Sequence, residues 1–300
     1  MNRMLCRSAG ALARTLATAA LAAAFTMPAM AEAPQTGRLV AIGGAVTEIL
    51  YDLGLESQVI GVDTTSLYPA RALKDKPNIG YMRALSAEGV LSLDPSLVLA
   101  IEGSGPPDAL RQISEAKVPL VMVPDEQTPE GVVAKIDAIG KLTGQEAAAH
   151  KLAEGVSARF ATLAADRAKI QKPMRVLFVL SLQNGRAMAA GRHTAADSVI
   201  ALAGGINAVA EMDGYKPLTD EAVIAAAPDV VLMMDRGDHG AAQDVFALPA
   251  FSATPAAARK ALVVMDGLYL LGFGPRTPDA ARELMARLYP GLAPQPAAKP

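Results

Sequence analysis

Cysteine is almost absent from this sequence of 300 residues. The single cysteine, Cys6, excludes an internal disulfide and any metal site built from several thiolates. Tryptophan is missing, and aromatic residues make up only 4 % of the chain, so a tyrosine in a loop is conspicuous. The three histidines have no partners at metal-ligand spacing. The GxSxG, HExxH and P-loop motifs are absent too, so the sequence does not predict an enzyme.

No charge of one sign dominates the chain. It carries 28 basic and 30 acidic residues, a net charge of −2, and contains no basic run of the kind that binds phosphates. Nucleic acid is therefore not an expected partner.

Long hydrophobic runs are confined to the first 31 residues. Arg3, Arg7 and Arg14 are followed by an alanine-rich apolar stretch at residues 15–27 and then by the small-residue triplet at 29–31. This order predicts a signal peptide over residues 1–31, cleaved near Ala31, and hence export to the periplasm. The stretch is too short to span a bilayer comfortably, and Cys6 precedes it, which argues against a lipoprotein. The mature protein is expected to be soluble.

Short apolar runs alternate with amphipathic ones after residue 37. The runs at 39–42, 59–62, 97–101 and 119–123 predict buried strands, and residues 107–116 predict a helix between the last two. Strands that alternate with helices predict an α/β lobe with a mostly parallel sheet. We place this amino-terminal lobe at residues 37–143.

One long helix is predicted to follow this lobe. Residues 145–170 are alanine-rich and contain no proline, and Pro173 limits the helix at its carboxyl end. The strand–helix pattern restarts at residues 175–180. The sequence thus predicts a linker helix over 144–171 and a carboxy-terminal α/β lobe over 172–291.

A repeated pattern indicates that the two lobes are built alike. Gly80-Tyr81 is followed by a loop, the triplet Ser86-Ala87-Glu88, a helix, a proline and a strand. Gly214-Tyr215 is followed by Thr219-Asp220-Glu221 and the same succession. Because ligands bind outside the carboxyl ends of parallel strands, we expect a ligand cleft where the two loop sets face each other.

Each repeat holds a hydroxyl residue and a glutamate that admit two interpretations. Ser86 and Thr219 are suited to cap helices, with Glu88 and Glu221 favoured in the first turn by the helix dipole. The two glutamates could also present one carboxylate per lobe to arginines on a two-fold symmetric partner.

Tyr81 is the leading candidate for a ligand contact. It lies in a loop before a capped helix, where it could pack over the loop or act as a phenolate ligand to ferric iron, as in some haem proteins. A free tyrosine ionises only near pH 10, so iron or a guanidinium would have to favour the phenolate. Arg83 and Arg236 are candidates to pair with that phenolate or with a propionate. His239 is a weaker candidate for a secondary contact.

The chain resembles the haem-binding periplasmic proteins of bacterial haem ABC importers, the HmuT, ShuT and PhuT group within the vitamin B12 and siderophore class. The resemblance spans residues 38–290. Its most specific segments are Gly80-Tyr81-Met82-Arg83-Ala84-Leu85-Ser86-Ala87-Glu88-Gly89, Ala189-Ala190-Gly191, Ala203-Gly204-Gly205-Ile206-Asn207, Gly214-Tyr215 and Gly272-Phe273-Gly274-Pro275-Arg276-Thr277.

The resemblance implies a role for each candidate residue. Tyr81 would ligate the iron of a carried ferric haem, and Arg236 would support the phenolate or bind a propionate. Tyr215 would stack on the ligand. Glu88 and Glu221 would dock on an inner-membrane haem permease, which works with an ATPase. An outer-membrane haem receptor would act upstream, and the carrier would be a monomer.

One departure from the family favours a single haem. Some members hold a second, stacked haem with a histidine after the first strand of the second lobe, where this chain reads Ser181-Leu182-Gln183-Asn184-Gly185. Two alternatives stay open: a corrinoid or ferric-siderophore carrier of the same fold, and an exported α/β enzyme. A ferric siderophore already saturates its iron and would not need the Tyr81 phenolate, and the enzyme would need a catalytic set.

Overall fold

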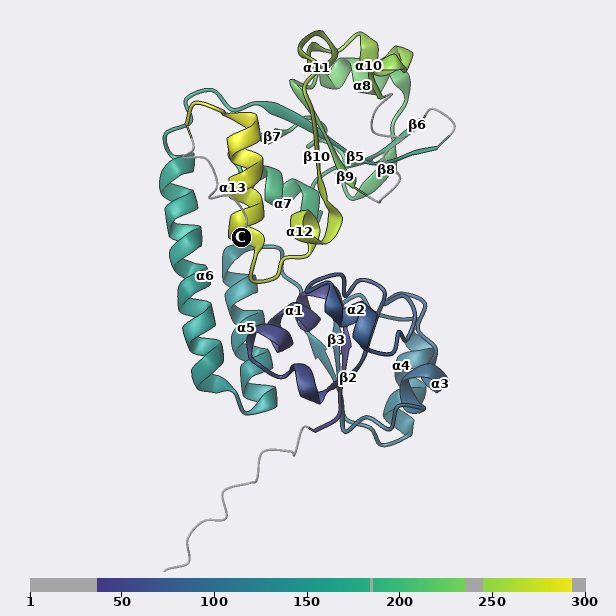
Figure 1. Ribbon diagram of the computed structural model, residues 1–300. Coiled ribbons are helices and arrows are strands. Elements are labelled where there is room, and N and C mark those ends of the chain that lie inside the picture. Colours follow the sequence, from purple (N-terminus) through teal and green to yellow (C-terminus); the bar gives the residue numbers. More distant parts are fainter. Residues whose placement is uncertain (1–36, 184–185, 236–244, 293–300) are drawn as a thin grey trace, which may run out of the picture. The chain divides into compact units, whose positions relative to one another are not determined.

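The computed structural model describes residues 37–183, 186–235 and 245–292 (Figure 1). The predicted signal peptide therefore lies outside the described residues. The described chain forms two α/β lobes, each with its own sheet, and a helical connection between them. No helix in these ranges is both long enough and apolar enough to cross a membrane.

The amino-terminal lobe is a parallel sheet with helices between its strands. The sheet has four strands in the order β2-β1-β3-β4. The elements are β1 (Leu39–Ile42), α1 (Gly44–Asp52), the 3-10 helix η1 (Glu56–Gln58), β2 (Val59–Val62), α2 (Arg71–Asp75), α3 (Ala87–Leu91), β3 (Leu97–Ile101), α4 (Pro107–Glu115) and β4 (Leu120–Val123).

The central strands of this sheet are continuous apolar runs because both of their faces are covered. Every residue of β1 and β3 is buried, and Leu39 pairs with Leu97 in parallel register. Gly43 permits the turn into α1: its φ is 106°, and a Cβ there would lie 2.6 Å from Ile101 Cγ2. The sheet thus delivers its loops to one edge, at the carboxyl ends of the strands.

Two helices connect the lobes. Helix α5 (Pro129–Thr143) is capped by the Thr128 hydroxyl and ends at Gly144, which adopts the left-handed conformation with φ 68°. Helix α6 (Glu146–Arg167) follows at once and packs along α5 (Figure 1).

The carboxy-terminal lobe is built around a six-stranded sheet. The path of its strands is β10-β9-β5-β6-β8, and β7 pairs with β5. The elements are β5 (Arg175–Gln183), β6 (Arg186–Ala190), α7 (Ala195–Leu202), β7 (Ile206–Asn207), β8 (Tyr215–Pro217), α8 (Asp220–Ala226), β9 (Val230–Asp235), the 3-10 helix η2 (Val245–Ala247), α10 (Pro249–Ser252), α11 (Pro255–Arg259), β10 (Leu262–Asp266), α12 (Gly267–Leu271) and α13 (Thr277–Leu288).

This second sheet is mixed. Strands β10, β9, β5 and β7 run parallel, whereas β6 pairs antiparallel with both β5 and β8. The predicted class of two α/β lobes with mostly parallel sheets is confirmed, and the antiparallel strand β6 with its neighbour β8 adds to it.

The repeated pattern takes a different form in each lobe. Ser86 and Thr219 cap α3 and α8, as predicted, and Glu88 and Glu221 are each the second residue of their helix. The Gly-Tyr pairs differ, however. Tyr81 lies in a loop, whereas Tyr215 begins strand β8 and pairs with Ala190 of β6. The two lobes are therefore equivalent from the cap and the glutamate onward, through the helix to the strand that follows it, β3 in one lobe and β9 in the other.

One buried apolar cluster continues from one lobe into the other. It includes Leu39 of β1, Phe160 of α6 and Phe178 of β5. Polar contacts cross the same junction: Lys135 Nζ donates to the Phe273 carbonyl at 3.1 Å, and Arg159 pairs with Asp279 at 2.6 Å. The segment after α12 and the first turn of α13 therefore join the second lobe to the helices of the connection.

Candidate ligand-binding site

Tyr81 projects from a loop whose backbone is tightly held. Gly80 takes a φ of 96°, which a residue with a side chain rarely adopts, and its N–H donates to Asn78 Oδ1 at 2.9 Å. The Gly80 carbonyl accepts from the Thr64 N–H at 2.9 Å, and the Tyr81 carbonyl accepts from the Ala84 N–H at 2.8 Å. These bonds fix the main chain on both sides of the tyrosine.

The Tyr81 side chain itself remains available. It is 45 % exposed, and its hydroxyl makes no hydrogen bond to the described residues. A large aromatic side chain on a fixed loop at the carboxyl edge of a parallel sheet has the position expected of a ligand contact.

Arg83 and Tyr215 come from different lobes and act on each other electrostatically. Burial raises the pKa of the Tyr215 phenol, whereas the Arg83 guanidinium and a hydrogen bond with Thr194 lower that pKa and oppose the rise. Arg83 is exposed, and Tyr215 is 41 % exposed. Of the predicted site residues, these two are brought together by the fold.

Two predicted contacts cannot be placed. Arg236 and His239 were expected to contribute from the loop after the second-lobe strand, and both lie outside the described residues. Strand β9, which precedes them, ends at Asp235.

Glu88 and Glu221 are exposed on the first turns of α3 and α8. The capping hydroxyls of Ser86 and Thr219 accept from the N–H groups of Gly89 at 3.3 Å and Ala222 at 3.2 Å. A hydrogen bond from its own backbone N–H, and then the Thr219 hydroxyl, hold the pKa of Glu221 below its usual range. Both glutamates therefore stand on fixed helix ends, one in each lobe.

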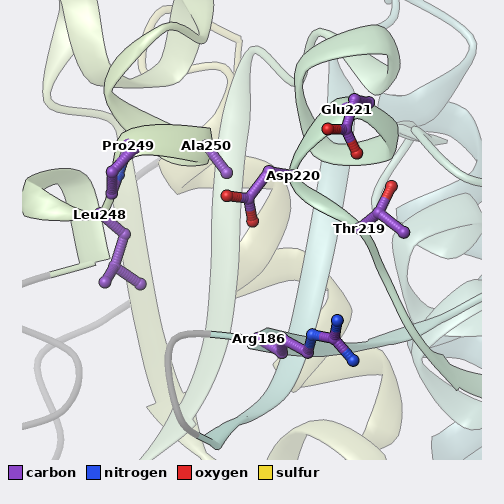
Figure 2. Close-up of a pocket in the computed structure, with 7 residues that line it drawn as sticks. All are labelled: Arg186, Thr219, Asp220, Glu221, Leu248, Pro249 and Ala250. Atoms are coloured by element: carbon purple, nitrogen blue, oxygen red, sulfur yellow. The ribbon is translucent and has the colours of Figure 1, made fainter.

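A separate pocket of about 420 Å³ lies beside the first turn of α8. Figure 2 shows Asp220 and Glu221 on that turn, with the Arg186 side chain below them. The remaining lining residues are Thr219, Leu248, Pro249 and Ala250. Neither Tyr81 nor Tyr215 lines this pocket, so it is distinct from the candidate ligand site.

The structure adds an ion pair that the residue patterns did not predict. Buried Glu48 of α1 accepts from Arg276 Nη2 at 2.9 Å and from the Arg276 N–H at 3.1 Å. The same guanidinium lies over the Tyr68 ring, 3.5 Å from its centroid. Burial raises the pKa of Glu48, and the bond and charge of Arg276 oppose that rise. The one available signal was the segment at residues 272–277, which the sequence singled out without a role.

The chain belongs to the periplasmic binding protein family, whose model matches residues 39–268. Among solved structures, it is similar to the periplasmic haem-binding protein BhuT in complex with two haems, at 42 % identity and a TM-score of 0.81, over 85 % of this chain and 99 % of that one. The haem-binding protein RhuT of Roseiflexus sp. RS-1, in apo form, is 40 % identical with a TM-score of 0.81, over 84 % and 98 %. A curated vitamin B12-binding protein of Yersinia pestis is 26 % identical over 70 % of this chain and 72 % of its own.

These findings confirm the resemblance drawn from the sequence. They place the chain in a class of binding proteins rather than a class of enzymes. Substrate-binding proteins of ABC transporters work with a membrane permease and an ATPase. Membership of this family also implies that the protein is exported.

Proposed function

We propose that this protein binds ferric haem in the periplasm and delivers it to an ABC permease for uptake of haem and iron. The observation that carries the proposal is Tyr81: an exposed phenol with no hydrogen bond to the described residues, on a loop that hydrogen bonds hold in place. The likeness to haem-binding proteins at 40–42 % identity supports the same ligand.

The residues around Tyr81 fit haem chemically. A phenolate is a known axial ligand of haem iron, and the iron charge favours loss of the phenol proton. Arg83 is an exposed cation on the same loop, suited to a propionate or to the phenolate. Tyr215 offers a half-exposed aromatic ring next to Arg83 for stacking on the macrocycle. Arg236 and His239 complete the proposed set from the segment after β9.

Haem is favoured over a corrinoid because a coordinating phenol is available. A corrinoid or a ferric siderophore brings its metal with ligands already in place, so Tyr81 would contribute only contact area. The vitamin B12-binding relative keeps the corrinoid as the second candidate.

Hemin titration with absorption spectroscopy tests the ligand and the role of Tyr81. We expect the wild-type protein to give a Soret shift that saturates near one hemin per chain, because β5 ends without a histidine for a second haem. Tyr81→Phe removes only the hydroxyl and should abolish the spectrum of a phenolate-bound ferric haem. Tyr215→Phe is the matched variant in the other lobe and should retain that spectrum.

Three results would change the proposal. No shift with wild-type protein would reject haem as the ligand. An unchanged spectrum in Tyr81→Phe together with its loss in Tyr215→Phe would move the iron ligand to the other lobe. Saturation at two equivalents would reject the single haem.

Transport is proposed to depend on Glu88 and Glu221. Each would engage arginines on one half of the permease, since carboxylate–guanidinium pairs combine charge with a fixed geometry. An outer-membrane haem receptor would supply the periplasm, and the carrier would act as a monomer after cleavage of the signal peptide near Ala31.

A further inference from the structure

Two large, partly exposed side chains are consecutive on a loop of the first lobe. Leu67 is 50 % exposed and Tyr68 is 41 % exposed, and they follow β2 at the carboxyl edge of the parallel sheet. Single exposed apolar residues are common on protein surfaces and need no explanation. Two consecutive exposed apolar residues on a rigid loop beside the candidate site do need an explanation.

The loop that carries this pair is fixed by a buried carboxylate. Asp63 is fully buried, and its Oδ1 accepts from the Gly43 N–H at 2.8 Å and from the Ser66 hydroxyl at 3.1 Å. The Thr65 N–H donates to Asp63 Oδ2 at 3.0 Å. These bonds join the loop after β2 to the turn after β1, so Leu67 and Tyr68 are presented by a preorganised backbone.

The same loop is hydrogen-bonded to the Tyr81 segment. The Thr64 N–H donates to the Gly80 carbonyl at 2.9 Å, one residue before Tyr81. The two loops therefore lie next to each other at one edge of the sheet. One carries the apolar pair and the other carries the Tyr81 phenol.

The Tyr68 ring is held by a cation and is still partly exposed. Arg276 stacks on the ring at 3.5 Å, and Glu48 fixes this guanidinium from the buried side. A cation held against an aromatic ring orients the ring. The remaining 41 % exposure of Tyr68 is the area that a ligand could cover.

We propose that Leu67 and Tyr68 form an apolar contact surface for the planar ring of the haem that Tyr81 coordinates. This inference rests on the proposed function and adds to it a part of the binding surface that lies outside the repeated Gly-Tyr pattern. A macrocycle is large, flat and mostly apolar, so it gains affinity from covering exposed apolar side chains.

The test compares hemin affinity and hemin spectrum in four variants. Leu67→Ser and Tyr68→Ala remove the proposed contacts, Tyr68→Phe keeps the ring, and Ile224→Ser changes a similarly exposed apolar residue, 46 % exposed, on α8. We expect Tyr68→Ala to weaken hemin binding about tenfold and Leu67→Ser several-fold, the size of effect that lost apolar burial produces. Tyr68→Phe should restore most of the affinity lost in Tyr68→Ala.

The spectrum separates this inference from the assignment of the iron ligand. All four variants should show the wild-type Soret position at saturation, because Tyr81 is untouched. Wild-type affinity in both Leu67→Ser and Tyr68→Ala would overturn the inference while leaving the proposed function intact. Equal weakening by Ile224→Ser would also overturn it, since the effect would not be local.

Leu67→Ser distinguishes a lost ligand contact from a loss of protein stability. Tyr68→Ala uncovers the Arg276 guanidinium and could lower stability, which thermal unfolding would report. Leu67 is half exposed and takes no part in the stack on Arg276, so its substitution addresses the contact surface alone. Failure of wild-type protein to bind hemin would reject the proposed function, a result distinct from any of these.

Discussion

Tyr215 experiences two opposed influences, and this makes it a sensitive probe of the site. Burial raises the pKa of its phenol, and the Arg83 guanidinium lowers that pKa. Without the Arg83 cation, the rise in the Tyr215 pKa that burial causes is opposed less. We therefore predict that Arg83→Gln moves the ionisation of Tyr215 to higher pH, because a nearby positive charge no longer favours the phenolate.

Spectrophotometric titration of the tyrosines measures this shift. Subtracting the titration of the matching Tyr215→Phe protein isolates the Tyr215 contribution from that of the other tyrosines. Arg111→Gln removes an exposed arginine of α4 instead, and it should leave the pH at which Tyr215 ionises unchanged. An equal titration in the presence and absence of Arg83 would show that the two side chains do not face each other in solution.

Some of these residues could be found from sequence and others could not. The caps at Ser86 and Thr219 were predictable because a hydroxyl before an acidic first turn is a local signal. Glu48 gave no such signal, since it lies in the apolar run of α1 and its partner Arg276 is 228 residues away. Tyr68 was missed for the same reason: its exposure and its stacking cation are consequences of tertiary structure.

At the scale of elements, the ion pair between Asp166 and Arg282 joins α6 to α13. Its carboxylate accepts from Lys169 and from Arg282 of α13, each at 2.8 Å. The hydrogen bond from Lys169, followed by the charges of Lys169 and Arg282, holds the pKa of Asp166 below its usual range. A lowered pKa means that the ionised carboxylate of Asp166 is more stable in the folded state than in the unfolded state, so its ionisation favours folding.

We predict that Asp166→Asn lowers the free energy of unfolding by about 1 kcal/mol at neutral pH, as expected for a buried carboxylate whose cationic partners are partly exposed to solvent. The contribution exists above the unfolded pKa and is lost as the pH falls, so the difference from wild type should shrink below about pH 4. Denaturant unfolding at several pH values measures it. Asp137→Asn on the exposed side of α5 is the control, and a difference that grew on acidification would contradict the assignment.

The strands of the first sheet were predictable because their sequences are continuous apolar runs. Residues 39–42, 59–62 and 97–101 were predicted as strands, and the structure has them as β1, β2 and β3 with the same bounds. Strand β8 was missed because Tyr215–Pro217 is exposed at all three residues and lies at the end of the sheet. Its pairing with β6 comes from the fold and has no counterpart in local hydrophobicity.

At the scale of the whole molecule, the two lobes each present one glutamate on a capped helix. Glu88 and Glu221 occupy the same position in α3 and α8, and both are exposed. The arrangement suits a partner with two similar halves, and in the proposed function it assigns docking and ligand binding to different residues.

We predict that Glu88→Arg combined with Glu221→Arg leaves hemin affinity unchanged and reduces haem transport at least about tenfold, because each substitution would set like charges against the arginines proposed on the permease. Transport is measured in vesicles that contain the reconstituted permease and ATPase, with hemin affinity titrated on the same preparation. An arginine in the first turn opposes the helix dipole, so thermal unfolding is recorded alongside.

A second charge reversal distinguishes docking from a general change of charge. Glu146→Arg combined with Glu154→Arg alters the net charge equally, on exposed positions of α6. We expect this protein to support normal transport, because its substitutions lie on a different element from the two docking helices. Equal loss of transport in both double variants would mean that overall charge, rather than the two helix ends, governs association with the permease. Normal transport by the Glu88 and Glu221 variant would reject those residues as the docking pair while leaving the proposed role of Tyr81 unaffected, since the proposal assigns neither glutamate to the haem site.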